Sequence, residues 1–458
     1  MSSHISPSPA SLGKVHFIGI GGVGMSAVAR IMVARGVPVS GSDAKDLPVM
    51  ADLAAVGARI AVGYAAANLA DAQTVVAGSA IREDNPELAA ARQAGLPVLH
   101  RSQALAATMG GDTVVTVAGT HGKSTTTSMI TVLLQAAGLD PSFAVGANIP
   151  ALGVNAAHGT SGIFVAEADE SDGSFLNYRP RIAVVTNVEP DHLDYYGTAE
   201  AVYESFDRFT ALLPADGLLV ACADDAGALA LAERTRARGN TRVALYGTGE
   251  AADVRLDDGG PGHVSVSTDG ARYSLSLQVP GRHNALNAAA AFAVALELGV
   301  EPAAAADGLA RFSGASRRFE LKGAARGVRV FDDYAHHPTE VRAALTAARS
   351  VAAGHKVHVL FQPHLFSRTR EFAPQFAEAL NLADTALVLD IYPAREDPIP
   401  GVTSQLIADH LTQGGRLVGA EEAVNVLAGA ASDGDIVLTV GAGDVTAYGP
   451  RIVEALRA

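Results

Sequence analysis

The chain has 458 residues, 48% of them hydrophobic, with 34 lysine and arginine residues against 48 acidic ones and a net charge of −14. At roughly 150 residues per domain, this length predicts three domains. The acidic balance argues against a nucleic-acid partner, because phosphate backbones are bound by clustered lysine and arginine side chains.

Residues 1–12 are rich in serine and proline and contain no apolar core segment, so they predict a disordered tail and not a signal peptide. No apolar run is long enough to span a membrane. The single cysteine, Cys222, excludes an intrachain disulfide and lies in an apolar run, where we expect a small buried side chain. We therefore expect a cytoplasmic enzyme that does not insert into a membrane.

Residues 13–110 alternate between short apolar runs and helical runs, which predicts a domain with a parallel α/β sheet. The predicted strands are 15–18, 37–40, 73–77 and 98–99, and the predicted helices are 25–35, 86–94 and 103–108. Each helix would provide the crossover between neighbouring parallel strands.

A glycine motif, which includes Gly22, joins the first predicted strand to the first helix. Gly19, Gly21 and Gly24 fit the G-x-G-x-x-G pattern of a nucleotide-binding turn, and Asp43 follows about 20 residues later, where such folds bind a ribose hydroxyl. The motif alone does not choose NAD over another diphosphate. It is also compatible with glycines that only permit close packing of helix and strand.

Residues 111–315 form the second predicted domain, in which the strand 113–117 leads through a glycine-rich loop into a helix over 127–137. The loop residues are Gly119, Thr120, His121, Gly122, Lys123, Ser124 and Thr125. Backbone N–H groups and the positive end of the helix bind phosphates in such turns. Lys123 can reach the β- and γ-phosphates, and the Ser124 hydroxyl can bind Mg²⁺. The two glycines lie closer together than in the usual phosphate loop, yet the flanking strand and helix favour a site for ATP or GTP.

Acidic residues follow the next strand, 163–166, and Glu167 is the one that we expect to face a metal ion. We expect the remaining acids of this run to form a solvated loop. A further strand, 182–186, is followed by His192 between two aspartates. His192 is either a ligand of a second divalent cation or a surface histidine, and its spacing alone does not decide between them.

The second domain closes with short strands between residues 243 and 279, which predict an antiparallel edge, and with a helix over 284–298. Asn284 and Asn287 lie on one face at the start of this helix. Their amides suit the edge of an adenine base, although an asparagine near a helix start is also an ordinary cap.

Residues 316–458 predict a third α/β domain, with strands over 328–331, 357–361, 386–389 and 436–440. Tyr334 and His336 follow the first of these strands, and His364 and Arg368 follow the second. A zinc site is disfavoured, because the side chains of the adjacent residues His336 and His337 point in different directions and no third ligand has a suitable spacing. An edge that binds phosphate or carboxylate fits better, since Arg368 can bind two oxygens at once.

Several motifs occur in the order typical of the Mur ligases, which the chain resembles over nearly all of its length after the tail. These motifs are residues 16–26, 119–125, 167–174, 187–194, 282–287, 333–341 and 361–370. Their match in order is far more specific than any single motif.

The resemblance implies three domains: an N-terminal Rossmann-like domain, a central P-loop-type ATPase with a mixed sheet, and a C-terminal Rossmann-like domain. It implies that ATP activates the lactyl carboxylate of UDP-N-acetylmuramate as an acyl phosphate, which L-alanine then attacks, with ADP and phosphate as products. Such a reaction belongs to peptidoglycan precursor synthesis in the bacterial cell wall. We also expect the C-terminal domain to close over ATP, because an acyl phosphate must be kept from water.

The resemblance also implies roles for the candidate residues. The UDP-sugar would bind at Gly19, Gly21, Gly22, Gly24 and Asp43, and ATP at Gly119, Thr120, His121, Gly122, Lys123, Ser124, Thr125, Asn284 and Asn287. Mg²⁺ would bind Ser124, Glu167 and His192, and the amino acid would meet Tyr334 and His336. The catalytic set would be Lys123, Glu167, His192, His336, His364 and Arg368.

The closest alternative is the recycling ligase of the same family, which attaches a tripeptide to the same UDP-sugar. The N-terminal domain disfavours a folylpolyglutamate synthase, and the phosphate loop with its downstream acids disfavours an NAD-dependent dehydrogenase or a non-catalytic regulator. The chain departs from the family pattern at Ser124, where Thr is usual, at Leu365, where many relatives have Arg, and at Tyr64, where His is common. The sequence leaves the oligomeric state open.

Overall fold

The computed structural model describes residues 9–78, 80–258, 264–394, 396–412 and 415–458, and the chain forms two compact units. The first unit includes the N-terminal and central sheets; the second comprises Leu277–Ala285 and Ser313–Ala458. The predicted domain boundary near residue 110 lies inside the first unit, between two separate sheets, and the exact domain limits stay a prediction. Most of the predicted tail lies outside the described residues, but Pro9–Leu12 forms a 3-10 turn with a buried Leu12.

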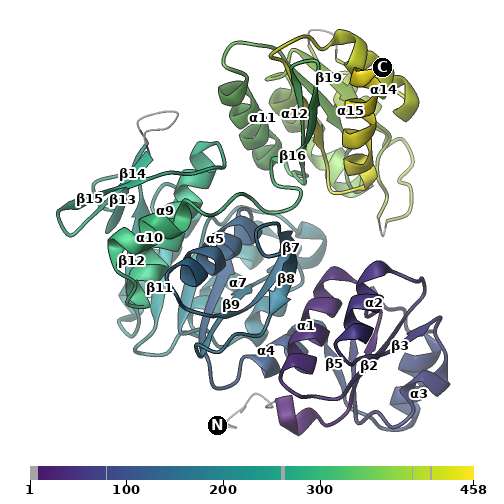
Figure 1. Ribbon diagram of the computed structural model, residues 1–458, viewed down its shortest axis with the longest axis vertical. Coiled ribbons are helices and arrows are strands. Elements are labelled where there is room, and N and C mark those ends of the chain that lie inside the picture. Colours follow the sequence, from purple (N-terminus) through teal and green to yellow (C-terminus); the bar gives the residue numbers. More distant parts are fainter. Residues whose placement is uncertain (1–8, 79, 259–263, 395, 413–414) are drawn as a thin grey trace. The chain divides into compact units, whose positions relative to one another are not determined.

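The N-terminal domain has a five-stranded parallel sheet in the order β3-β2-β1-β4-β5 (Figure 1, purple to blue). All four side chains of the central strand β1 are buried, as expected for a parallel sheet covered on both faces. Its strands are β1 (Val15–Ile18), β2 (Val39–Asp43), β3 (Arg59–Val62), β4 (Thr74–Ala77) and β5 (Val98–His100). Its helices are α1 (Val23–Ala34), α2 (Pro48–Ala55), α3 (Pro86–Gln93) and α4 (Arg101–Thr108), with a 3-10 turn, η2 (Ala66–Leu69).

A buried carboxylate braces this sheet. Glu87 of α3 accepts hydrogen bonds from Ser42 Oγ at 2.5 Å and Asn68 Nδ2 at 2.6 Å, and it contacts His16 Nε2 at 3.2 Å. Burial alone would raise the pKa of Glu87, but the hydrogen bonds hold that pKa below its usual value. Glu87 therefore ties α3 and the segment after β3 to the strands that carry the glycine loop.

The central domain has a ten-stranded mixed sheet in the order β15-β14-β13-β12-β11-β10-β6-β9-β7-β8. Its strands are β6 (Thr113–Ala118), β7 (Ser142–Ile149), β8 (Val154–Ala157), β9 (Ile163–Glu167), β10 (Ile182–Val185), β11 (Leu218–Cys222), β12 (Arg242–Gly247), β13 (Val254–Asp258), β14 (Val264–Thr268) and β15 (Ala271–Leu275). The helices are α5 (Lys123–Ala136), α6 (Leu193–Tyr196), α7 (Ala199–Thr210), α8 (Ala226–Arg238), α9 (Arg282–Glu297) and α10 (Pro302–Leu309), with a 3-10 turn, η3 (Ser174–Asn177).

Strand β6 pairs in parallel with β9 on one side and β10 on the other. The carboxyl ends of these three strands therefore meet at one edge of the sheet, where α/β proteins place their ligands. At the far edge, β13, β14 and β15 pair antiparallel, which confirms the predicted antiparallel edge.

The second unit has a six-stranded sheet in the order β16-β17-β21-β18-β19-β20, and only β16 runs antiparallel. Its strands are β16 (Glu320–Ala325), β17 (Val328–Asp333), β18 (Val357–Phe361), β19 (Thr385–Val388), β20 (Arg416–Leu417) and β21 (Ile436–Val440). Its helices are α11 (Pro338–Ala352), α12 (Phe366–Leu380), α13 (Gln405–Ala408), α14 (Ala420–Ala430) and α15 (Tyr448–Arg457), with a 3-10 turn, η4 (Asp444–Ala447).

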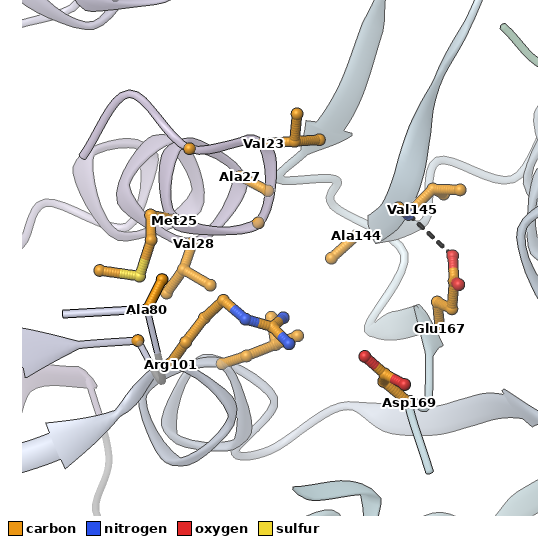
Figure 2. A pocket seen from close by; sticks show the side chains of 15 residues that line it. Val23, Met25, Ala27, Val28, Ala80, Arg101, Ala144, Val145, Glu167 and Asp169 are labelled. Atoms are coloured by element: carbon orange, nitrogen blue, oxygen red, sulfur yellow. Dashed lines mark hydrogen bonds between the residues drawn. The ribbon is translucent and has the colours of Figure 1, made fainter. Parts of the chain in front are cut away.

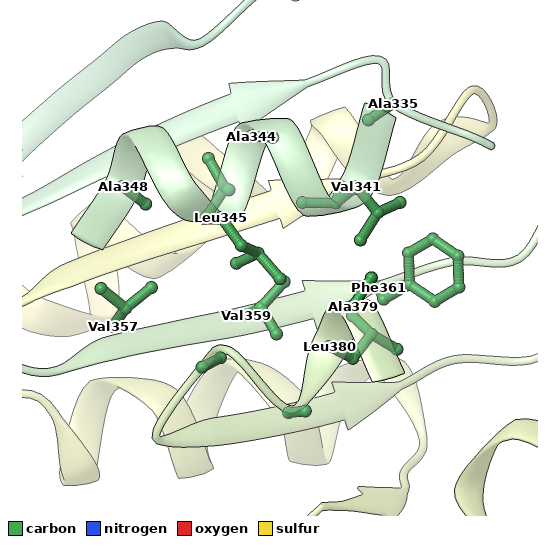
Figure 3. Close-up of a cluster of buried hydrophobic side chains, with 14 of the residues drawn as sticks. Ala335, Val341, Ala344, Leu345, Ala348, Val357, Val359, Phe361, Ala379 and Leu380 are labelled. Carbon is green, nitrogen blue, oxygen red and sulfur yellow. The ribbon is translucent and has the colours of Figure 1, made fainter. Parts of the chain in front are cut away.

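Apolar side chains at helical spacing hold α11 on this sheet. Val341, Leu345 and Ala348 of α11 face Val359 and Phe361 of β18 in one buried cluster (Figure 3). Helices of this cluster cover one face of the sheet, and a second cluster with α14 and α15 lies on the other. The predicted three-domain α/β architecture is confirmed.

The structure differs from the sequence prediction at several elements. Helix α5 begins at Lys123 and not at residue 127, because Gly122 adopts a left-handed conformation and caps the helix directly after the loop. Glu167 is the last residue of β9 and does not lie beyond it. Within the described part of the chain, no helix is both long and apolar enough to cross a membrane.

Candidate active site

The turn between β6 and α5 requires glycine at two positions. Gly119 has a φ of +131° and Gly122 a φ of +83°, a region that L side chains rarely adopt. A β-carbon at Gly119 would lie 2.1 Å from Thr186 Oγ1, and one at Gly122 would lie 2.9 Å from Asn287 Oδ1. The backbone at both positions is therefore free to approach a ligand closely, as in a phosphate-binding turn.

Hydrogen bonds to the segment after β10 hold this loop in shape. Thr186 Oγ1 donates to the His121 carbonyl at 2.6 Å, and the His121 N–H donates to Asn187 Oδ1 at 2.8 Å. Thr120 Oγ1 accepts from the Glu189 N–H at 2.9 Å. The first N–H groups of α5 have no partner inside the helix, so a loop fixed in this way presents donors for phosphate oxygens.

Lys123 lies inside the loop and pairs with a buried acid. Its Nζ donates to the carbonyls of Gly119 at 2.7 Å and Thr120 at 3.1 Å, and to Glu170 Oε1 at 2.9 Å. Glu170 is only 2% exposed, so the prediction of a solvated acidic loop is wrong for this residue. The chain folds back after β9, and the acid run therefore packs against the loop.

Burial and the neighbouring charges shift the pKa values of both Lys123 and Glu170. Burial alone would lower the pKa of Lys123, but Glu170, Asp169 and Glu167 raise it to about 12. Burial raises the pKa of Glu170 to about 7, although Lys123 opposes that shift. Sequence reasoning missed Glu170, since neither a motif nor a period distinguishes it from its acidic neighbours.

Ser124 and Glu167, the predicted metal ligands, contact each other. The Ser124 hydroxyl donates to Glu167 Oε2 at 2.9 Å, and the Gly146 N–H donates to the same oxygen at 2.8 Å. A hydroxyl and a carboxylate beside a phosphate loop are the oxygen donors that Mg²⁺ prefers. These residues therefore fit the ion.

His192 faces the same cluster of acids. Its Nε2 lies 3.6 Å from Glu170 Oε1 and 3.6 Å from Asp191 Oδ2, and its backbone has a φ of +56°. Glu170 Oε2 is buried and has no hydrogen-bond partner among the described residues. A cation beside His192 would satisfy that oxygen.

A cavity of about 380 Å³ connects the N-terminal glycine loop with this site (Figure 2). Gly22 and Gly24 line one wall, and Glu167 and Asp169 line another. Asp43 lies behind the loop, where it accepts a hydrogen bond from the Gly21 N–H at 3.0 Å. The structure thus assigns Asp43 a contact that stabilises the loop, and the predicted ribose contact stays a prediction.

The two asparagines have different surroundings. Asn287 is buried beside Gly122 of the phosphate loop, as an ATP-binding residue would be. Asn284, in the second unit, is also buried, and its Nδ2 donates to the Pro280 carbonyl at 2.6 Å. This bond is a local one of the kind expected for a residue near a helix start.

In the second unit, the predicted residues gather where β17 and β18 end. The His336 ring lies 5.3 Å from the Tyr334 ring and 6.0 Å from the His364 ring. Arg368 is 7% exposed on α12, in the turn that follows His364. The guanidinium groups of Arg317 and Arg318, which sequence reasoning missed, lie 4.9 and 5.1 Å from the centre of the Tyr334 ring.

The loop, its lysine and the paired hydroxyl and carboxylate define the site of a nucleotide-dependent enzyme. Residues 14–113 match the Mur ligase family, catalytic domain, residues 117–295 the Mur ligase middle domain, and residues 317–443 the Mur ligase, glutamate ligase domain. The chain belongs to the Mur ligase family.

Two curated relatives are both named UDP-N-acetylmuramate–L-alanine ligase. The protein of Paenarthrobacter aurescens (strain TC1) is 79% identical over 446 residues, covering 97% of this chain and 98% of that protein. The protein of Arthrobacter sp. (strain FB24) is 82% identical over 448 residues, covering 98% of this chain and 96% of that protein. The crystal structure of UDP-N-acetylmuramate-alanine ligase from Thermotoga maritima has a TM-score of 0.79 at 30% identity, covering 97% of this chain and 99% of that one.

Proposed function

We propose that the chain joins L-alanine to the lactyl carboxylate of UDP-N-acetylmuramate, with conversion of ATP to ADP and phosphate, in peptidoglycan precursor synthesis. The contact between Ser124 and Glu167 beside the Lys123 loop supports the ATP-dependent step, because a hydroxyl and a carboxylate there are oxygen donors suited to Mg²⁺. The names and high identity of the curated relatives support the substrates. The cytoplasmic location stays a prediction.

ATP is needed because a carboxylate is a poor electrophile. Transfer of the γ-phosphoryl group gives an acyl phosphate; the amine then attacks the carbonyl carbon, loses a proton and expels phosphate. The first step depends mainly on positioning and charge neutralisation. Lys123 and the N–H groups of α5 bind the phosphates and offset the charge that moves between them.

Magnesium would be held by Ser124 and Glu167, with His192 near a second position. When bound, the ion neutralises phosphate charge and orients the transferring group. Asp169 and Glu170 surround Lys123 and raise its pKa, so that the lysine stays charged throughout the working pH range. We assign Asn287, whose side-chain oxygen lies beside Gly122 of the loop, to the nucleotide.

The second unit supplies the groups for the amino acid. We assign Tyr334 and His336 to L-alanine, and His364 and Arg368 to the acyl phosphate. Leu365, where many relatives have arginine, is buried with 6% exposure. Arg317 and Arg318 lie beside the Tyr334 ring, and each forms an ion pair, Arg317 with Asp332 and Arg318 with Glu340.

The test is phosphate release by the purified protein with ATP, Mg²⁺ and UDP-N-acetylmuramate, with either L-alanine or L-Ala-γ-D-Glu-meso-diaminopimelate. We expect turnover with L-alanine alone. Turnover with only the tripeptide would assign the chain to the recycling reaction. No turnover with either would contradict the proposed substrates while leaving the ATP site to be tested by nucleotide binding.

A further inference from the structure

The cavity beside the glycine loop has a single cationic side chain, Arg101, among the described residues that line it. Arg101 is the first residue of α4. Its guanidinium extends into the cavity toward the wall that carries Asp169 (Figure 2). Glu167 and Asp169 alone would repel an anionic sugar nucleotide, so Arg101 changes the charge that this cavity presents.

Gly24 provides the space in which Arg101 lies. A β-carbon at Gly24 would be 2.9 Å from Arg101 Cδ and 3.2 Å from Nε, so any larger residue would displace the arginine. The φ of Gly24 is not in the left-handed region, so backbone conformation does not require a glycine at this position. The close approach of the Arg101 side chain accounts for the absence of a larger residue.

The guanidinium has no hydrogen bond and no ion pair with any residue in the described part of the chain, although it is half-buried. The charge of Asp169 acts on Arg101 only through space. A half-buried cation without a hydrogen-bonded partner is costly, and part of this cost is recovered when an anion binds. Arginine suits such a role, because its planar fork binds two oxygens of a carboxylate or phosphate at once.

We infer that Arg101 binds an oxyanion of the sugar nucleotide, and that glycine at position 24 leaves the space that the Arg101 side chain occupies. The inference rests on the proposed function, since it takes the sugar nucleotide as the occupant of the cavity. The oxyanion is either the diphosphate or the lactyl carboxylate, and the two share the chemistry that a guanidinium recognises.

The first test is Arg101→Met, which keeps the apolar stem and removes the charge. We expect the Kd and KM for UDP-N-acetylmuramate to rise about 10- to 100-fold, the effect of losing a charged hydrogen-bonding pair. The KM for ATP and the melting temperature should stay unchanged. Arg101→Lys should recover part of the loss, and Arg59→Met, at an exposed arginine of β3, is the matched control.

Gly24→Ala provides an independent test, which also decides the matter if Arg101→Met does not fold. We expect this variant, like Arg101→Met, to raise the Kd for UDP-N-acetylmuramate. When it is combined with Arg101→Met, the loss should be no larger than for Arg101→Met alone, because the displaced arginine is already absent. Fully additive losses would overturn the role given to Gly24.

Competition with UDP-N-acetylglucosamine, which lacks the lactyl carboxylate, distinguishes the two oxyanions. Equal weakening of both sugar nucleotides by Arg101→Met assigns Arg101 to the diphosphate, and weakening of UDP-N-acetylmuramate alone assigns it to the carboxylate. Unchanged binding of UDP-N-acetylmuramate by folded Arg101→Met would overturn the inference. Failure of the proposed function would instead show as absent turnover in the unsubstituted protein.

Discussion

At the phosphate loop, the Lys123 ammonium group holds the loop in shape, and we propose that the same group takes part in catalysis. It bonds two loop carbonyls and Glu170, and the Glu170 carboxylate is 2% exposed. Removing one partner of a buried ion pair leaves the other charge without compensation, which costs about 3–5 kcal/mol. The loop lysine is therefore expected to affect stability as well as turnover.

We predict that Lys123→Met abolishes phosphate release and lowers the urea midpoint of the first unit, while binding of UDP-N-acetylmuramate persists. The double variant Lys123→Met/Glu170→Leu should recover most of the stability but none of the turnover, since the uncompensated carboxylate is gone. Urea titration and a phosphate-release assay measure the two effects. An unchanged midpoint in Lys123→Met would show that the pair contributes nothing to stability.

Cys222 gives a prediction about reactivity. Burial in β11 raises the pKa of this thiol to about 11, so at pH 8 only about one molecule in a thousand carries the reactive thiolate. We expect the folded protein to react negligibly with Ellman's reagent at pH 8, and the unfolded protein to react with one equivalent. Rapid reaction of the folded protein would place Cys222 outside the core.

At the scale of elements, the strand-to-helix turn before α5 depends on how tightly its glycines are enclosed. Gly122 and Gly138 lie at the two ends of α5 and share a φ of +83°. A β-carbon at Gly122 would contact Asn287 Oδ1, whereas a β-carbon at Gly138 would meet nothing within 4 Å. Substituting each glycine by alanine therefore distinguishes two effects. Both variants strain the backbone, but only the one at Gly122 also crowds the candidate nucleotide site.

We predict that Gly138→Ala lowers stability by about 1–2 kcal/mol, the cost of a left-handed alanine, and leaves the KM for ATP unchanged. Gly122→Ala should lose at least as much stability and also raise the KM for ATP, because Asn287 and the loop must shift. Thermal melts and steady-state kinetics on both variants measure these effects. An unchanged KM in Gly122→Ala would contradict the role given to this turn.

At the scale of the whole molecule, the proposed reaction draws on both compact units. The phosphate loop belongs to the first unit, and Tyr334 and His336 belong to the second. The acyl phosphate and the amine must meet within bonding distance and away from water. Under the proposed mechanism, we therefore expect turnover to need groups from both units.

We predict that a non-hydrolysable ATP analogue together with UDP-N-acetylmuramate decreases the radius of gyration, as measured by small-angle X-ray scattering. Lys123→Met with the same ligands is the control, because it should retain the sugar nucleotide but bind the nucleotide analogue poorly. Unchanged scattering of the unsubstituted protein at saturating ligand would count against closure.

Strands and helices that repeat apolar residues with a clear period were predictable from the sequence. The runs 113–117 and 357–361 became the buried strands β6 and β18. Strands β7 and β16 were missed, since β7 is interrupted by Gly146 and β16 is a partly exposed edge with little apolar alternation. An edge strand is stabilised by its neighbour's backbone, and its own side chains carry little signal.

The family, the three α/β domains and the phosphate loop follow from the amino-acid sequence alone, because each depends on the local spacing of glycines, apolar residues and polar groups along the chain. The pairing of Glu170 with Lys123 and the position of Arg101 over Gly24 depend on how the chain folds in three dimensions. These contacts join residues from different elements and loops, and crossover connections in a parallel sheet separate such residues widely in sequence. Local patterns identify the loop, and packing between elements determines which charges surround it.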